Sequence, residues 1–201
     1  MTISDSENPT VTCVADQVRN TSTGDCTYTY IGTSWNATAA DNCGTPSVSY
    51  GLTGATTATV ATSLDGVVFN KGVTNIIVTV TDGAGNAADP NCSFTVTIND
   101  TENPVLVDVP INISVNNDVD SCDAIVSWTE PTATDNCTGE SIAQTAGLSI
   151  GSFFPIGIST ITYTVTDGSG NEDVGSFNIT VTDSQDPEIT CPTDITQNID
   201  A

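Results

Sequence analysis

The sequence contains no histidine, and its only cationic side chains are Arg19 and Lys71, against 25 aspartates and glutamates. The net charge of −23 argues against nucleic acid as a partner, because binding phosphates requires cations that displace counterions. Docking on anionic lipid is disfavoured for the same reason, since it needs a polybasic patch. Without histidine the chain also lacks the usual general base and the commonest zinc ligand.

Long apolar runs and aromatic side chains are also scarce. No apolar stretch approaches the roughly 20 residues of a membrane-spanning helix, so we expect no membrane insertion. The first residues have neither the basic nor the apolar region of a secretory signal peptide. Paired carboxylates could indicate a glycosidase, whose cleft is usually lined by aromatic residues, but we expect Trp35 and Trp128 to be core residues and not platforms for a sugar. No base accompanies a Ser or Cys nucleophile. We therefore expect no enzymatic activity.

Cysteine, in contrast, is plentiful for a chain of 201 residues. There are seven cysteines and no Cys-x-x-Cys pair. This usage is typical of disulfides formed in an oxidising compartment, so we expect an extracellular protein. A secreted chain with no signal of its own is expected to be a segment of a larger protein.

Three motifs occur twice in the same order. Asp-x-Glu-Asn-Pro begins at Asp5 and again at Asp100, and Asp-Asn-Cys ends at Cys43 and again at Cys137. The run Thr-Val-Thr-Asp-Gly-x-Gly-Asn ends at Asn86 and again at Asn171. The first motif returns in altered form at Asp183. Repeats at a fixed order indicate tandem units. The predicted domains are repeat 1 over residues 1–99, repeat 2 over 100–182, and the start of a third repeat over 183–201.

Each repeat has the period of β-strands. Alternating β-branched residues predict strands over residues 76–81, 94–98, 159–165 and 177–181, separated by Gly, Asn, Asp and Pro. No helical periodicity of useful length is present. The predicted fold class is all-β, with tandem immunoglobulin-like antiparallel β-sandwiches.

The motifs resemble the HYR (hyalin repeat) family, an immunoglobulin-like module of extracellular proteins. The resemblance rests on Asn8-Pro9 before Cys13, on Asp41-Asn42-Cys43, on the Asp82–Asn86 motif and on Cys92-Ser93-Phe94. In repeat 2 it rests on Phe154-Pro155-Ile156-Gly157, and at the start of the third repeat it rests on Ile189-Thr190-Cys191-Pro192. The resemblance implies adhesion or spacing outside the cell, in tandem arrays such as those of bacterial surface proteins, including gliding adhesins. It implies no catalysis.

The family pattern also implies a disulfide pairing. Repeat 2 lacks the first and last family cysteines together, since Asp108 and Gly175 stand at the positions of Cys13 and Cys92. Joint loss is what a bonded pair predicts, so we pair Cys13 with Cys92. The remaining expected pairs are Cys26–Cys43 and Cys122–Cys137. Cys191 aligns with Cys13, and its expected partner would lie beyond residue 201.

The acidic motifs are expected to converge. In an immunoglobulin-type sandwich the start of the first strand, the B–C loop and the F–G loop lie at one end of the domain. Clustered carboxylates repel one another unless a cation compensates, and oxygen ligands without histidine or thiolate suit Ca²⁺. The linker also resembles the acidic linkers of cadherin-like proteins, where calcium stiffens the joint. The predicted ligands are Asp100, Glu102, Asp135, Asp167 and Asn171 between the repeats, and Asp5, Glu7, Asp41, Asp82 and Asn86 at the start of repeat 1.

Other interpretations of these residues stay open. Asp-Gly and Gly-Asn are ordinary turn formers, so the motifs could serve turns alone. The favoured function is a non-catalytic stalk segment of a large cell-surface protein, stiffened by calcium between neighbouring repeats of the same chain. The alternative is a module that binds a surface polysaccharide or a partner protein. An exposed aromatic or apolar patch would favour that alternative.

Overall fold

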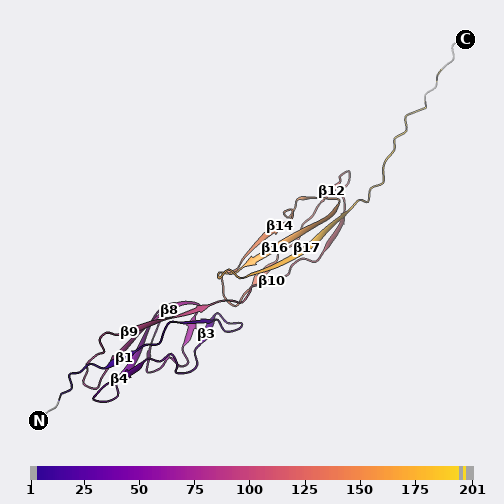
Figure 1. Ribbon diagram of the computed structural model, residues 1–201. Helices are drawn as coiled ribbons and strands as arrows, with labels where there is room; N and C mark the ends of the chain where they lie inside the picture. Colours follow the sequence, from indigo (N-terminus) through magenta and orange to yellow (C-terminus); the bar gives the residue numbers. More distant parts are fainter. Residues whose placement is uncertain (1–3, 195–196, 198–201) are drawn as a thin grey trace. The chain divides into compact units, whose positions relative to one another are not determined.

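The computed structural model describes residues 4–194 and 197, and its regular elements are all strands (Figure 1). Nowhere in these described residues is there a helix long and apolar enough to span a membrane. The predicted all-β class is therefore confirmed.

Repeat 1 contains a five-stranded sheet in the order β2-β9-β8-β5-β6 and two small sheets, β1-β4 and β3-β7. Its strands are β1 (Thr10–Thr12), β2 (Gln17–Asn20), β3 (Thr27–Thr29), β4 (Thr38–Ala40), β5 (Ser47–Gly54), β6 (Ala58–Ala61), β7 (Val68–Asn70), β8 (Gly72–Thr81) and β9 (Cys92–Asn99). Strands β8 and β9 pair antiparallel, whereas β2 pairs parallel with β9.

Repeat 2 contains the corresponding four-stranded sheet in the order β11-β17-β16-β14, with the pairs β10-β13 and β12-β15. Its strands are β10 (Val105–Val107), β11 (Ile113–Asn116), β12 (Asp123–Ile125), β13 (Thr132–Thr134), β14 (Ser141–Ala146), β15 (Phe153–Pro155), β16 (Gly157–Thr166) and β17 (Glu172–Thr182). Strand β11 pairs parallel with β17, as β2 does with β9.

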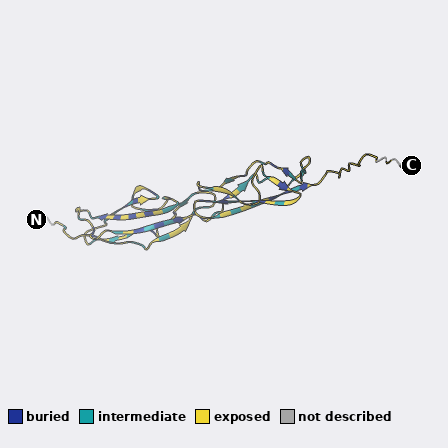
Figure 2. Cartoon of the chain, turned by 90° about the horizontal axis from the view of Figure 1, so that it is seen from above, coloured by how far each residue is buried: buried dark blue, intermediate teal, exposed yellow. Residues whose placement is uncertain are grey.

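The long strands bury every second residue. In β8 the side chains of Thr74, Ile76, Val78 and Val80 are buried, and those between them are exposed. Buried and exposed bands alternate along the long strands in Figure 2. This pattern follows from the strand period of two, which places successive side chains on opposite faces of a sheet. The four strands predicted from the sequence fall inside β8, β9, β16 and β17.

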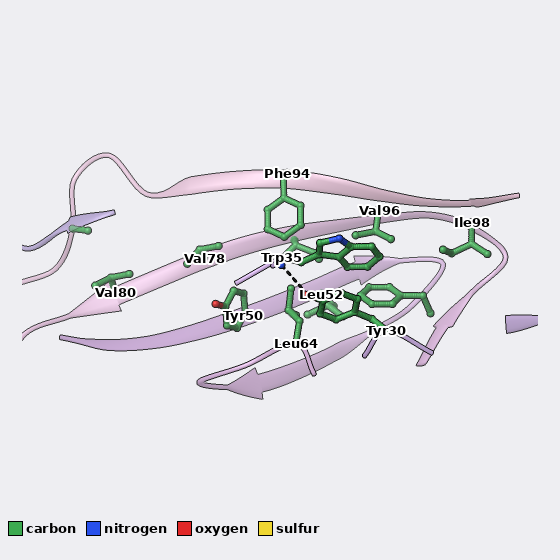
Figure 3. Packing of buried hydrophobic residues seen from close by; sticks show 13 residues of the cluster. Tyr30, Trp35, Tyr50, Leu52, Leu64, Val78, Val80, Phe94, Val96 and Ile98 are labelled. Atoms are coloured by element: carbon green, nitrogen blue, oxygen red, sulfur yellow. Dashed lines mark hydrogen bonds between the residues drawn. The ribbon is translucent and has the colours of Figure 1, made fainter. Parts of the chain in front are cut away.

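The core of repeat 1 packs the five-stranded sheet against aromatic residues of the opposite layer (Figure 3). Trp35 stacks on Tyr30 with ring centroids 4.0 Å apart, and its backbone N–H donates to the Tyr30 hydroxyl over 2.9 Å. Both side chains belong to the same buried cluster as Phe94 and Val96 of β9. Burial of such residues stabilises the fold by about 1.5–3 kcal/mol each. Trp35 is therefore a core residue and not a sugar platform.

Repeat 2 has its own, smaller core around Phe154, Ile161, Phe177 and Ile179. Trp128 packs against this cluster, and its indole N–H donates to the Tyr163 hydroxyl over 2.9 Å. The described chain divides into two compact units. The first comprises Met1–Val105, Ala133–Ile142 and Val165–Asp173, and the second comprises Leu106–Thr132, Ala143–Thr164 and Val174–Ala201. The first unit thus includes two loop segments of repeat 2.

The described residues form two disulfides, Cys13–Cys92 and Cys26–Cys137. The predicted pairs Cys26–Cys43 and Cys122–Cys137 do not form, and Cys43, Cys122 and Cys191 are free and exposed. Cys26 and Cys137 have Cα atoms 4.8 Å apart, within the range that a disulfide requires.

The length of the sandwich explains why Cys26 does not reach Cys43. The carbonyl of Cys26 accepts a hydrogen bond from the N–H of Lys71, just before β8 begins. Cys43 lies beside Asp5 and Asp41, in the cluster that contains Asp82, just after β8 ends. The ten residues of β8 span about 30 Å at the rise of a strand.

The same reason separates the second predicted pair. The carbonyl of Cys122 accepts from Ile156, just before β16, whereas Cys137 lies in the cluster of Asp100, which contacts Ser169 after β16 ends. Both predicted bonds would therefore have to cross the length of a ten-residue strand.

Candidate functional site

The first group of predicted ligands lies together in the first compact unit; we call it the Asp5 cluster (Asp5, Glu7, Asp41, Asp82 and Asn86). Asp5, Asp41 and Asp82 each place a carboxylate oxygen within 4.8 Å of the others. Three loops far apart in the sequence thus bring their acidic residues to one place, which is a donor set of hard oxygens.

The second group, which we call the Asp100 cluster (Asp100, Glu102, Asp135, Asp167 and Asn171), lies in the same compact unit. Oxygens of Asp100 and Asp135 and the sulfur of Cys137 lie within 4.8 Å of one another. That sulfur is bonded to Cys26, so it is not available as a thiolate ligand. Asp100 is only 5% exposed, which makes its charge costly unless it is compensated.

Asp82 and Asp167 organise the turns in which they lie. One carboxylate oxygen of Asp167 accepts from the N–H groups of Ser169 and Asn171, both over 2.8 Å, and the other accepts from the Asn171 amide, also over 2.8 Å. Asp82 makes the same set of bonds with Ala84 and Asn86. The turn interpretation of this motif therefore describes most of the bonding of these two carboxylates.

These bonds also set the acidity of the two groups. Burial raises the pKa of Asp82 and of Asp167, but hydrogen bonds from the following Asn, first among several turn donors, outweigh it. The net pKa of each carboxyl is lowered, so both stay ionised at neutral pH.

The asparagine that ends each turn ties it to the linker motif. The Asn86 amide donates to the carbonyl of Asp5, and the Asn171 amide donates to the carbonyl of Asp100, both over 3.3 Å. In these bonds the predicted residues Asn86 and Asn171 act as donors. They position the backbone of the two linkers beside the acidic loops.

Glu7 and Glu102 point to other partners. Glu102 accepts from the N–H of Gly24 at 2.9 and 3.2 Å, while Glu7 accepts from the amide of Asn42. Of the five predicted ligands in the Asp100 cluster, the structure thus brings the oxygens of Asp100 and Asp135 together and engages the other three in hydrogen bonds.

Lys71, the one lysine in the sequence, lies at the Asp100 cluster. Its ammonium is 3.6 Å from an Asp100 carboxylate oxygen and donates to the hydroxyl of Ser169 over 2.8 Å. A cleft of about 470 Å³ is lined by these residues and Thr101 among others. The Asp100 cluster contains four carboxylates, and Asp100 is the one that the Lys71 ammonium contacts.

Two buried oxygens have no hydrogen-bond partner at the Asp100 cluster, one on Asp135 and one on the adjacent residue Asn136. In the described part of the chain three buried side-chain polar atoms are unpaired: Asp135 Oδ1, Asn136 Oδ1 and Thr21 Oγ1. The Asn136 amide nitrogen donates to the carbonyl of Asp25 over 3.0 Å and to Asp100 over 3.4 Å, so its oxygen is the group left over. Sequence reasoning missed Asn136, although the repeated Asp-Asn-Cys motif contains it.

Comparison with known proteins identifies the family of repeat 2. Residues 99–181 match the HYR domain. Hyalin from the sea urchin Strongylocentrotus purpuratus is 39% identical over 146 residues, which are 69% of this chain and 12% of that protein. Hyalin from Lytechinus variegatus is 34% identical over 142 residues, 68% of this chain and 26% of that protein. The chain thus spans about a quarter or less of these relatives. Both come from sea urchins, so the bacterial setting stays a prediction.

Solved structures with some likeness are cadherin repeats. A structure of human CDH23 EC21–23 has 14% identity and a TM-score of 0.37, and covers 88% of this chain and 70% of its own. The protocadherin gamma B4 extracellular domain has 12% identity and a TM-score of 0.40, and the match covers 88% of this chain and 34% of the protocadherin chain. TM-scores of this size carry no argument about function.

Proposed function

We propose that this chain is a non-catalytic structural and adhesive segment of an extracellular repeat protein, and that calcium binds at the Asp100 cluster. In this role the partners of the chain are neighbouring repeats of the same protein. The net charge of −23 keeps such segments soluble and apart.

The unpaired oxygens of Asp135 and Asn136 carry the calcium proposal. A buried oxygen without a partner costs free energy, and a bound cation removes that cost. Ca²⁺ takes six to eight oxygen ligands, including carboxylates and amide carbonyls. Asp100, Asp135 and Asn136 would supply side-chain ligands, while Asp167 and Asn171 hold the adjacent backbone in place. Calcium would add two positive charges to a cluster of four carboxylates, of which only Asp100 contacts the Lys71 ammonium.

The Asp5 cluster supports a second, weaker site. Asp5, Asp41 and Asp82 meet there as well, but the equivalent oxygen of Asn42 is not among the unpaired buried atoms of the described residues. We therefore place tighter binding at the Asp100 cluster.

The extracellular location rests on the two disulfides and on the similarity to hyalins. A stalk on a cell surface, bacterial or otherwise, is the finer form of this proposal. It is supported by the tandem HYR-type motifs and by the strongly acidic, histidine-free composition.

Thermal unfolding with and without calcium tests the proposal. The full chain would be melted in millimolar CaCl₂, in chelator, and in NaCl of matched ionic strength. Binding to the folded state alone adds about 2.7 kcal/mol at a hundredfold excess over Kd, which raises Tm by several degrees. Asp135→Asn should remove most of this rise, and the exposed Glu130→Gln, which loses the same charge outside both clusters, should keep it. Equal Tm values in calcium and chelator would refute calcium binding.

A second function, recognition of a partner protein or surface polysaccharide, is favoured by an apolar patch in the second unit. Ile125 and Phe153 face each other across the β12–β15 pair and are 55% and 64% exposed. Exposed aromatic side chains of this kind are common at binding surfaces. Binding of the chain to a glycan array or a protein library, lost in Phe153→Ser, would support this role, and unchanged binding in the variant would contradict it.

A further inference from the structure

The Cys26–Cys137 disulfide connects two positions that each repeat possesses. Cys26 of repeat 1 corresponds to Cys122 of repeat 2. The Cys26 carbonyl accepts from the N–H of Lys71 over 3.3 Å, and the Cys122 carbonyl accepts from the N–H of Ile156 over 3.2 Å. Lys71 and Ile156 each lie directly before the long strand of their repeat, β8 and β16. The two cysteines therefore occupy the same place in their sandwiches.

Cys137 of repeat 2 corresponds in the same way to Cys43 of repeat 1. Each follows Asp-Asn, and each donates its N–H to the carboxylate two residues earlier, Asp135 and Asp41, over 3.0 Å. Cys26 and Cys122 thus form one equivalent pair of positions, which we call Cys26-type, and Cys43 and Cys137 form another, which we call Cys43-type. The observed disulfide joins the Cys26-type cysteine of repeat 1 to the Cys43-type cysteine of repeat 2. The remaining cysteine of each type, Cys122 and Cys43, is free.

A second, independent observation concerns the linkers. Glu102, at the start of repeat 2, accepts from the N–H of Gly24 in the turn before Cys26. Gln185, in the third copy of the linker motif, accepts from the N–H of Asp120 in the turn before Cys122 over 3.1 Å. Gly24 and Asp120 share the left-handed conformation, with φ of 76° and 57°.

The same linker turn recurs in both places. The N–H of Glu102 donates to Asp100 over 3.2 Å, and the N–H of Gln185 donates to Asp183 over 3.1 Å. The turn before Cys122 thus already holds a linker in the way that the turn before Cys26 does.

We propose that Cys122 and Cys43 are half-cystines of inter-repeat disulfides, each completed by another repeat of this type. Cys122 bonds the cysteine of an Asp-Asn-Cys loop, and Cys43 bonds a Cys26-type cysteine. This inference rests on the proposed role as a segment of repeats, and it does not depend on calcium. A second copy of this chain carries both positions and is the partner used as a probe.

The reaction balances with a small disulfide as oxidant. The Cys122 thiolate attacks one sulfur of oxidised glutathione, forms a mixed disulfide and releases one glutathione thiolate. The Cys43 thiolate of the second copy then attacks the Cys122 sulfur and displaces the second glutathione. Two protein thiols lose two protons and two electrons in total, and oxidised glutathione becomes two molecules of reduced glutathione.

The test uses full-length copies that each keep one of the two thiols. One copy carries Cys43→Ser and Cys191→Ser and retains Cys122; the other carries Cys122→Ser and Cys191→Ser and retains Cys43. They are given different tags, mixed in a glutathione redox buffer and separated on a non-reducing gel. Peptide mapping by mass spectrometry identifies the bonded cysteines and verifies that Cys13–Cys92 and Cys26–Cys137 are intact.

We expect the Cys122–Cys43 heterodimer to exceed each homodimer by about tenfold, the ratio that a modest docking preference gives. The excess should vanish in denaturant, where the positions are no longer presented by folded repeats. A statistical mixture of heterodimer and homodimers under native conditions would overturn the inference. Loss of the calcium-dependent Tm rise would leave this result unaffected, so the two proposals fail separately.

Discussion

Removal of the Cys13–Cys92 disulfide should lower the free energy of unfolding of repeat 1 by about 4–5 kcal/mol. The bond spans a sequence separation of 79 residues, and closing a loop of that size is worth about 4.5 kcal/mol in the chain-entropy model. Both cysteines pack against the core only at its margin, so replacement by alanine adds a small loss of contacts. Because a domain is typically stable by about 5–15 kcal/mol, the double variant should lose between roughly a third and nearly all of the stability of repeat 1.

Urea unfolding followed by tryptophan fluorescence measures this loss. The chain has two tryptophans, Trp35 in the core of repeat 1 and Trp128 against the core of repeat 2. Trp128→Phe leaves a reporter for repeat 1, and Trp35→Phe leaves one for repeat 2. In the first background Cys13→Ala/Cys92→Ala should lower the urea midpoint by roughly 1.5–4.5 M, given typical denaturant slopes of about 1–3 kcal/mol per molar.

The second background supplies the matched control. Repeat 2 has no equivalent disulfide, so the Trp128 signal should keep its midpoint when Cys13 and Cys92 are replaced. A loss below about 1 kcal/mol in repeat 1 would refute the loop-entropy argument. An equal shift of both signals would refute the assignment of the effect to repeat 1 alone.

Three further predictions concern single side chains. Gly175→Ala should destabilise repeat 2 by about 1–3 kcal/mol in urea melts, because the added Cβ would lie 2.9 Å from a methyl group of Val109; an unchanged midpoint would show that Val109 yields freely. The lowered pKa values of Asp82 and Asp167 mean that these groups stabilise the fold above their unfolded pKa of about 3.8 and lose that effect as pH falls through the lower folded values. Thermal melts at successively lower pH below 4 should therefore show a falling Tm, and the variant Asp82→Asn/Asp167→Asn should show a smaller fall. If Tm falls equally with pH in the variant and the parent chain, these two carboxylates are not the cause. The pKa of the Cys43 thiol is raised chiefly by the charge of Asp5, so Asp5→Asn should speed alkylation of Cys43 by iodoacetamide at pH 8, as followed by mass spectrometry, and an unaltered rate would exclude that cause.

The strands and the gathering of acidic loops were accessible from sequence because both depend on local pattern. Alternation of β-branched residues dictates which face of β8 is buried, and loop order in a sandwich dictates that Asp5, Asp41 and Asp82 meet. The sequence does not predict which donors bond to each carboxylate oxygen. Asp167 is satisfied by its own turn, whereas one oxygen of Asp135 is left unpaired.

The cysteine pairing failed for a reason specific to repeats. Cys43 and Cys137 have the same sequence surroundings, so motif alignment offers Cys26 two candidates of equal quality. Sequence proximity favours Cys43, but Cys26 lies at the start of β8 and Cys43 beyond its end. Cys43 is therefore about 30 Å away, the length of β8. The antiparallel strand β9 returns the chain to the end of the sheet at which β8 begins, so it is the linker at Asp100, with Cys137 beside it, that lies near Cys26.

The Cys26–Cys137 bond also changes how the chain would respond to a pulling force. Tension that enters on the N-terminal side crosses at Cys26 and leaves at Cys137, so it bypasses a sequence separation of 111 residues. The whole core cluster of repeat 1 that follows Cys26 lies within that bypassed stretch. Fully extended, such a stretch would measure roughly 370–400 Å at about 3.3–3.6 Å per residue. An oxidised segment is thus nearly inextensible here. Reduction of Cys26–Cys137 together with Cys13–Cys92, which shields much of the same stretch, would release this extra length and so couple mechanical compliance to the redox state of the surroundings.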